Sequence, residues 1–138
     1  MKKIVIIIAI IALVLIGGII LALKFVTGSN NSKQQEKPVI VSLKKEILTN
    51  LANEGNIFHY IKVSVSLEVI NSSAAKIVET EMPRIRDEII LVFNGAKVNE
   101  LSTPAGIERV KERIIQRLNS LLNTKIVRKV LFTDMVVQ

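Results

Sequence analysis

Side chains that could perform acid–base or metal chemistry are few in this sequence, and their spacing forms no catalytic set. The chain has no cysteine and therefore lacks a thiol nucleophile, and its one histidine, His59, has no second cluster of metal-ligand residues beside it. The carboxylate pairs Glu79/Glu81 and Asp87/Glu88 lie between apolar residues at helical spacing, which predicts a solvated helix face. We therefore predict no enzymatic activity, no catalytic, metal-binding or cofactor-binding residues, and a structural role for His59.

A line of like charge is the more informative polar pattern. Arg109, Arg113 and Arg117 recur every four residues, and such a line disfavours an isolated helix by about 0.2–0.5 kcal/mol per pair. Two explanations stay open: Glu108 and Glu112 offset the charge locally, or the line contacts an acidic partner or a neighbouring copy. The candidate contact residues for assembly are Arg84, Arg86, Arg109, Arg113 and Arg117.

Overall charge does not by itself identify a partner. Sixteen basic and all twelve acidic residues follow Lys24, an excess of four positive charges spread along the chain. No cluster of basic residues is interleaved with aromatic ones, so a nucleic-acid partner is not predicted. The excess is interpreted as a mildly basic surface, with anionic lipid head groups or an acidic partner as the alternatives.

One segment predicts where in the cell the protein is located. It is a run of twenty residues, 4–23, without a charged or strongly polar side chain. As a helix it would be about 30 Å long, the thickness of the hydrocarbon core of a bilayer. Its length and the absence of a cleavage site favour an uncleaved membrane anchor over a signal peptide. Representative positions along this anchor are Ile4, Ile8, Ala12, Gly17, Gly18 and Leu23.

Topology and domain boundaries follow from this anchor. Lys2 and Lys3 precede it and Lys24 alone follows it, which predicts a cytoplasmic N-terminus and an external remainder. We expect residues 1–3 to be a cytoplasmic stub, 4–23 a transmembrane helix, 24–38 a flexible polar linker and 39–138 one external domain. A hundred residues suffice for a single core.

Within the external domain, alternation of apolar and polar residues predicts a strand over residues 57–69 with one buried face. A short extended run covers 38–41, and a last strand covers 126–137. In that last strand Arg128 and Asp134 fall on the same side as Val130 and Phe132. The irregularity indicates a bulge, or a strand partly covered on both faces.

Helical spacing follows Ser73 and lasts to residue 94, with Gly95 at the position of a helix C′ residue. Pro83 interrupts it, which favours two helices, the second with Pro83 in its first turn, over one kinked helix. Thr103 and Pro104 are an N-cap and a first helical residue for another helix ending near Leu122. The order of strand, helices and strand predicts an α+β domain with a small antiparallel sheet.

Five pieces of sequence in this order, one of them made of two short runs in the same strand, resemble the FliL family of flagellar basal-body-associated proteins. They are residues 49–52, 60–63, 67–69, 83–90, 101–106 and 130–138, the last ending in the same glutamine. The short basic N-terminus, membrane helix, polar linker and external domain are also similar. The chain departs from the family pattern at His59, where a basic residue is usual, and at Ala105, where an acidic one is frequent.

The resemblance implies a fold similar to the SPFH domain of stomatin-like proteins and assembly into a homo-oligomeric ring. It also implies a non-enzymatic accessory role at the flagellar basal body. Anchored in the inner membrane, the protein would contact stator proteins of the MotA/MotB type through its periplasmic domain and support torque or stator retention. No cofactor and no small-molecule substrate are expected. The alternative is a generic single-pass envelope scaffold of a secretion or cell-wall assembly.

Overall fold

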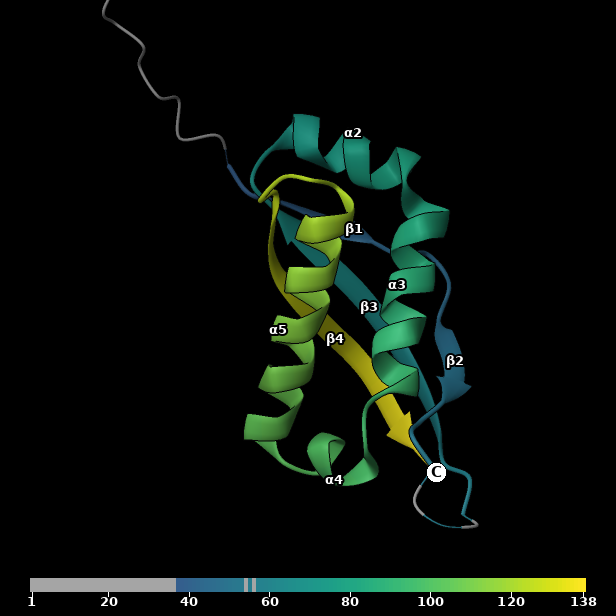
Figure 1. Ribbon diagram of the computed structural model, residues 1–138. Helices are drawn as coiled ribbons and strands as arrows, with labels where there is room; N and C mark the ends of the chain where they lie inside the picture. Colours follow the sequence, from purple (N-terminus) through teal and green to yellow (C-terminus); the bar gives the residue numbers. More distant parts are fainter. Residues whose placement is uncertain (1–36, 54, 56) are drawn as a thin grey trace, which may run out of the picture. The chain divides into compact units, whose positions relative to one another are not determined.

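The sheet is organised around one long central strand, as the computed structural model shows (Figure 1). The structure describes residues 37–53, 55 and 57–138. Their elements in chain order are β1 (Val39–Ser42), β2 (Ile47–Asn50), β3 (Tyr60–Val69), α2 (Ser72–Thr80), α3 (Met82–Asn94), α4 (Val98–Leu101), α5 (Pro104–Leu121) and β4 (Val127–Val137).

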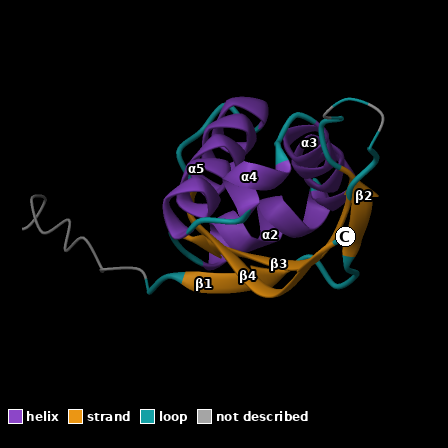
Figure 2. Cartoon of the chain, turned by 90° about the horizontal axis from the view of Figure 1, so that it is seen from below, coloured by secondary structure: helices purple, strands orange, loops and turns teal. Residues whose placement is uncertain are grey.

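The alternating pattern of β3 makes one face of the sheet apolar. Its inward residues are at most 3% exposed: Ile61, Val63, Val65, Leu67 and Val69. Within the described residues, helices α2 to α5 all lie on this face, and none of them covers the other face (Figure 2). The strand begins at Tyr60, so the prediction that it starts at Ile57 was three residues too long. The predicted α+β class with a small antiparallel sheet is confirmed.

The two edges of β3 are paired differently. Strand β4 pairs with one edge of β3 over nearly the whole length of β3, from Ile61 to Val69. The opposite edge is shared by two short strands, β1 against residues 66–69 and β2 against residues 60–63. Between them the chain leaves the ladder at Leu43, whose side chain is 2% exposed and whose N–H donates to the Val65 carbonyl at 3.0 Å. Strand β2 was not predicted from the sequence.

Two bulges explain the irregular pattern of β4. The register shifts between Ser64 and Val65 and again between Glu68 and Val69, and each shift leaves one extra residue on β4, Thr133 and Arg128. Each extra residue restores the alternation after it. As a result the inward partners of β3 are all apolar: Val127, Val130, Phe132, Met135 and Val137. The predicted bulge is confirmed.

The helical region after β3 divides at Pro83, as predicted. Helix α2 begins after Asn71, whose side chain accepts from the Ala74 N–H at 2.8 Å, and α3 has Pro83 in its first turn. Helix α3 ends at Asn94, so Gly95 lies one position before the predicted C′ position. Gly95 is the C-cap with φ −92° and ψ −7°, a right-handed conformation that any residue can adopt.

Helix α5 begins as its sequence predicts. Thr103 is the N-cap, its hydroxyl accepts from the Gly106 N–H at 3.1 Å, and Pro104 is the first helical residue. The four-residue helix α4, which precedes it, was not predicted. Gly106 is buried against α4, and a Cβ there would lie 1.9 Å from the Glu100 carbonyl oxygen. This contact fixes the corner between α4 and α5.

The predicted anchor is not part of the described structure. Over residues 37–53, 55 and 57–138, no helix has the length and apolar character needed to cross a bilayer. The predicted span 4–23 and the topology residues Lys2 and Lys3 lie outside this range. Most of the predicted linker, up to residue 36, lies outside it too.

Candidate partner-binding groove

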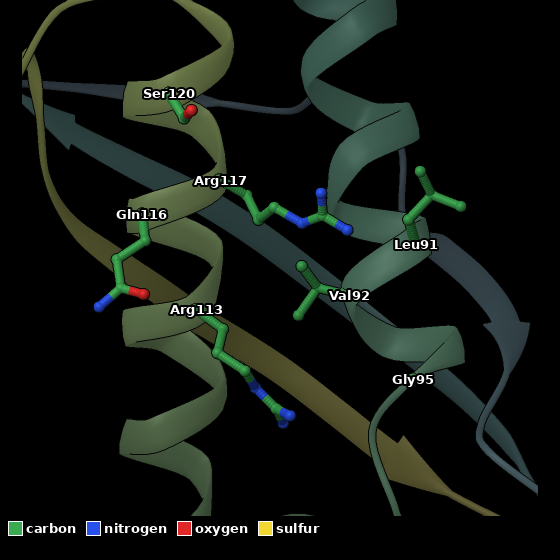
Figure 3. A pocket seen from close by; sticks show the side chains of 7 residues that line it. All are labelled: Leu91, Val92, Gly95, Arg113, Gln116, Arg117 and Ser120. Atoms are coloured by element: carbon green, nitrogen blue, oxygen red, sulfur yellow. The ribbon is translucent and has the colours of Figure 1, made fainter.

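Helices α3 and α5 pack side by side over the sheet, and a groove of about 460 Å³ lies between them. Residues on α5 that line it are Arg113, Gln116, Arg117 and Ser120, and those from α3 and its C-cap are Leu91, Val92 and Gly95. The two arginine side chains extend from α5 toward α3 (Figure 3). The groove therefore combines an apolar wall with two guanidinium groups.

The placement of the arginines follows from where α5 begins. Thr103 and Pro104 set the helix start, and its buried residues Val110, Ile114 and Leu118 face the core. Arg113 directly precedes Ile114, and Arg117 directly precedes Leu118. Both arginines therefore flank the buried face of α5 on the side nearest α3. Arg109, one turn earlier, is exposed and does not line the groove.

Carboxylates from other helices, rather than Glu108 and Glu112, balance the arginine line. Arg113 donates to Glu100 of α4 at 3.0 Å, and Arg117 lies 3.7 Å from Glu88 of α3. Glu108 pairs instead with Lys111 at 2.7 Å. The local compensation that the sequence suggested is therefore not how the protein arranges these charges.

Two buried polar atoms at this interface have no hydrogen-bond partner in the structure: Arg113 Nε and Glu88 Oε2. Glu88 thus attracts Arg117 across 3.7 Å without accepting a hydrogen bond through that oxygen. Buried polar atoms in native proteins are nearly always paired with protein, water or a ligand. Both atoms are shielded from solvent, so neither is accessible to an occupant of the groove.

Glu100 of α4 contacts the groove residue Arg113, and the pKa of the Glu100 carboxyl group is lowered. The backbone N–H of Lys97 donates to its carboxylate at 3.0 Å and lowers the pKa of Glu100, and the hydrogen bond and charge of Arg113 lower it further. Burial opposes this shift, and the charge of Arg109 adds to it. The carboxylate is thereby kept ionised where it holds Arg113 in place.

Replacing Glu100 with glutamine is expected to lower the free energy of unfolding by about 0.5–1 kcal/mol at pH 7, because a charge-assisted bond becomes neutral. Folding lowers this pKa from the ordinary 4.5. The stabilisation is therefore complete above that value and is lost as pH falls through the folded-state pKa. Urea denaturation at pH 7 and pH 3 should show the difference between wild type and variant shrinking at pH 3. An equal difference at both would contradict this, and exposed Glu79→Gln is the control.

The remaining predicted contact residues have separate positions on α3. Arg84 is exposed and pairs with Glu81 at 2.8 Å. Arg86 is half-buried, and its guanidinium donates to the carbonyls of Leu43, Lys45 and Glu46 in the segment between β1 and β2. Arg86 thus fills a structural position rather than the exposed position that the sequence suggested. The structure does not bring these two arginines into the groove.

An exposed apolar cluster at one end of the sheet was missed by the sequence reasoning. Leu48, Tyr60 and Val136 are 70%, 48% and 51% exposed. Leu48 and Val136 lie on either side of Lys62 in the register of β2, β3 and β4, and Ile57 and Phe58 are exposed in the segment just before β3. The signal in the sequence is the pair of large apolar residues Ile47 and Leu48, which is too short to predict a strand.

Metal chemistry finds no support in the part of the chain that the structure describes. No group of three or more histidine, aspartate or glutamate side chains there is arranged to hold an ion. His59 lies in the segment before β3, where its carbonyl accepts from the Leu51 N–H at 2.9 Å. The groove, with its paired arginines, is the better candidate for function.

Comparison with known proteins identifies the family. Residues 40–138 match the family model described as flagellar basal body-associated protein FliL. The chain is also 35% identical over 104 residues to a flagellar protein FliL from Aquifex aeolicus (strain VF5), covering 75% of this chain and 63% of that relative. The chain therefore spans somewhat less than two thirds of the relative's length. Because the family match covers the whole α+β domain, the chain belongs to the FliL family of flagellar basal body-associated proteins.

Proposed function

We propose that this protein is a non-enzymatic accessory of the flagellar motor that associates with the stator and supports torque generation or stator retention. The observation that supports the proposal most is the family match from residue 40 to residue 138, which covers the entire sheet and all four helices. The family description names a flagellar structure and no reaction. Family membership thus supports the flagellar role, and the stator contact is our extension of it.

In this proposal residues 4–23 anchor the chain in the inner membrane, with Lys2 and Lys3 in the cytoplasm. Residues 24–38 form a linker whose end-to-end distance as a coil is about 20 Å. The domain from 39 to 138, similar to an SPFH domain, then lies in the periplasm close to the membrane. Several copies assemble into a ring around the stator, and the exposed Arg84 and Arg109 are candidates for the contacts between copies.

The proposed mechanism is a shift of population. A ring stabilises the engaged stator only if it binds that form more tightly than the disengaged one. Each 1.4 kcal/mol of difference in binding free energy changes the ratio of the two forms about tenfold. No reaction step is needed, which agrees with a domain whose conspicuous polar residues are arginines in a groove.

The test is the cellular position of a fluorescent protein fused ahead of Met1, in cells whose swimming shows that the fusion is functional. We expect foci at the flagellar bases that disperse when the stator genes are deleted. Foci that persist without the stator would contradict the stator contact and indicate binding to the basal body itself. A uniform membrane signal would contradict the flagellar role and favour the envelope scaffold.

A further inference from the structure

We propose that the groove between α3 and α5 binds an acidic peptide segment of a partner protein, with carboxylates on Arg113 and Arg117 and an apolar side chain against Val92. The inference deepens the proposed function, on which it rests for the view that the partner belongs to the flagellar motor. The chemistry of the groove itself rests on the geometry of the described residues.

The arginines have unused capacity for hydrogen bonds. A guanidinium has five N–H donors. Arg113 uses one nitrogen on Glu100, and its side chain is still 41% exposed. Arg117 is 59% exposed, and its ion pair with Glu88 is 3.7 Å long. Carboxylates match the forked geometry of guanidinium groups, so an acidic side chain can bind the exposed N–H groups of both arginines.

The spacing favours a peptide over a single small anion. Arg113 and Arg117 are one helical turn apart, which places their Cβ atoms about 5–6 Å from each other. Two carboxylates at the same spacing occur on a helical segment with acidic residues four apart. The groove also has an apolar side, formed by Val92 and the exposed Leu91, which free phosphate would leave unused. Arg109 continues the charged line beyond the groove and favours the same sign of partner.

Gly95 keeps the end of the groove open. Its backbone does not require glycine, because its φ is −92°, and an added Cβ would meet only the carbonyl oxygens of Leu91 and Val92, at 3.7 Å. That distance is an ordinary van der Waals contact. A larger side chain at this position can therefore occupy the groove without straining the backbone.

The experiment measures binding of a labelled helical peptide with the repeat Glu-Ala-Ala-Leu-Glu to the full-length chain in a mild detergent, by fluorescence anisotropy. We expect saturable binding at low ionic strength that weakens several-fold in 0.5 M salt, as for screened charges. A peptide with glutamine for glutamate should bind at least about tenfold more weakly. Equal binding of the two peptides would overturn the proposal.

Two variants test the groove from its two sides. The double variant Arg113→Gln/Arg117→Gln removes the charge, and Gly95→Leu fills the space while leaving both arginines in place. Each should weaken peptide binding at least about tenfold. The matched control Arg128→Gln/Lys129→Gln removes two positive charges from exposed positions on β4 and should bind as wild type. If Gly95→Leu folds normally and binds the peptide as wild type, the groove is not the site.

Other occupants are distinguished by parallel measurements. Stronger binding to phosphatidylglycerol vesicles than to the peptide, lost in the double variant, would replace the peptide with a lipid surface and overturn the proposal. A change of oligomeric state in the Gly95→Leu variant, measured by sedimentation, would assign the groove to a second copy and also overturn it.

The same variants separate this inference from the proposed function. If wild-type fusions form stator-dependent foci and Gly95→Leu fusions do so equally, the groove proposal fails while the proposed function stands. If wild-type fusions form no foci although the peptide binds the groove, the proposed function fails while the groove's preference for acidic segments stands.

Discussion

Replacing Gly106 with alanine is expected to destabilise the domain by about 3 kcal/mol, although alanine is the better helix former by about 1 kcal/mol. The added Cβ would lie 1.9 Å from the carbonyl oxygen of Glu100 and 2.7 Å from its carbonyl carbon. Both are backbone atoms, so no side chain can rotate away, and α4 must move relative to α5. Because a domain of this size has a total stability of about 5–15 kcal/mol, the loss is large.

Urea denaturation of the variant and the wild type measures the loss of unfolding free energy. In thermal denaturation the melting temperature should fall by about 15 °C. The matched control is Gly95→Ala, whose Cβ has only ordinary contacts at 3.7 Å, so its stability should stay within about 0.5 kcal/mol of wild type. A Gly106→Ala protein as stable as wild type would show that α4 is free to shift. The displacement would also move Glu100, so peptide binding in the groove should weaken too.

Replacing Arg86 with alanine is expected to cost about 2–3 kcal/mol. Its guanidinium donates to the carbonyls of Leu43 and Glu46 at 3.1 Å each, and to that of Lys45. Hydrogen bonds from charged donors contribute about 1.5–3 kcal/mol each, and those exposed to water contribute less because water replaces them. The carbonyl groups in the segment between β1 and β2 would lose hydrogen-bond donors of the kind that a neighbouring strand would otherwise provide.

Amide exchange tests this assignment more directly than global stability does. The Leu43 N–H, which donates to Val65 at 3.0 Å, should exchange faster in Arg86→Ala than in wild type. Arg86→Lys should recover only part of the protection, because an ammonium cannot reach three carbonyls as a planar fork does. Arg84→Ala, two residues away and exposed in a surface ion pair, is the control and should change stability by less than about 1 kcal/mol. Unchanged exchange at Leu43 in Arg86→Ala would contradict the assignment.

Periodicity predicted the elements whose pattern is local. The alternation in β3, the cap and proline of α5 and the division at Pro83 each depend on neighbours in sequence. Strand β2 and helix α4 have four residues each, too few for either period to be recognised. A bulge in β4 was anticipated from two misplaced charges, Arg128 and Asp134, but the positions of the bulges depend on pairing with β3, whose partner residues lie 58 to 76 positions earlier in the chain.

The candidate site shows the same limit. The spacing of the α5 arginines was visible in the sequence, but their ion partners come from α3 and α4, so only the packing of the helices could identify them. For Arg86 the sequence suggested a surface contact, whereas its carbonyl partners lie 40 to 43 positions earlier. Residue type and helical position could not distinguish these two roles.

The divided edge of the sheet has a mechanical consequence. Any tension that reaches this domain through residues 1–36 arrives first at β1, a strand of four residues. Once β1 is peeled from β3, further unravelling must extract the side chain of Leu43 and break the bonds that Arg86 makes to three carbonyls. After β1 has separated, the contacts that resist further force are therefore the buried Leu43 side chain and the hydrogen bonds from Arg86 of α3. Under such a pull the domain would release one short strand, and Val41 with it, before Leu43 and the Arg86 bonds come under load.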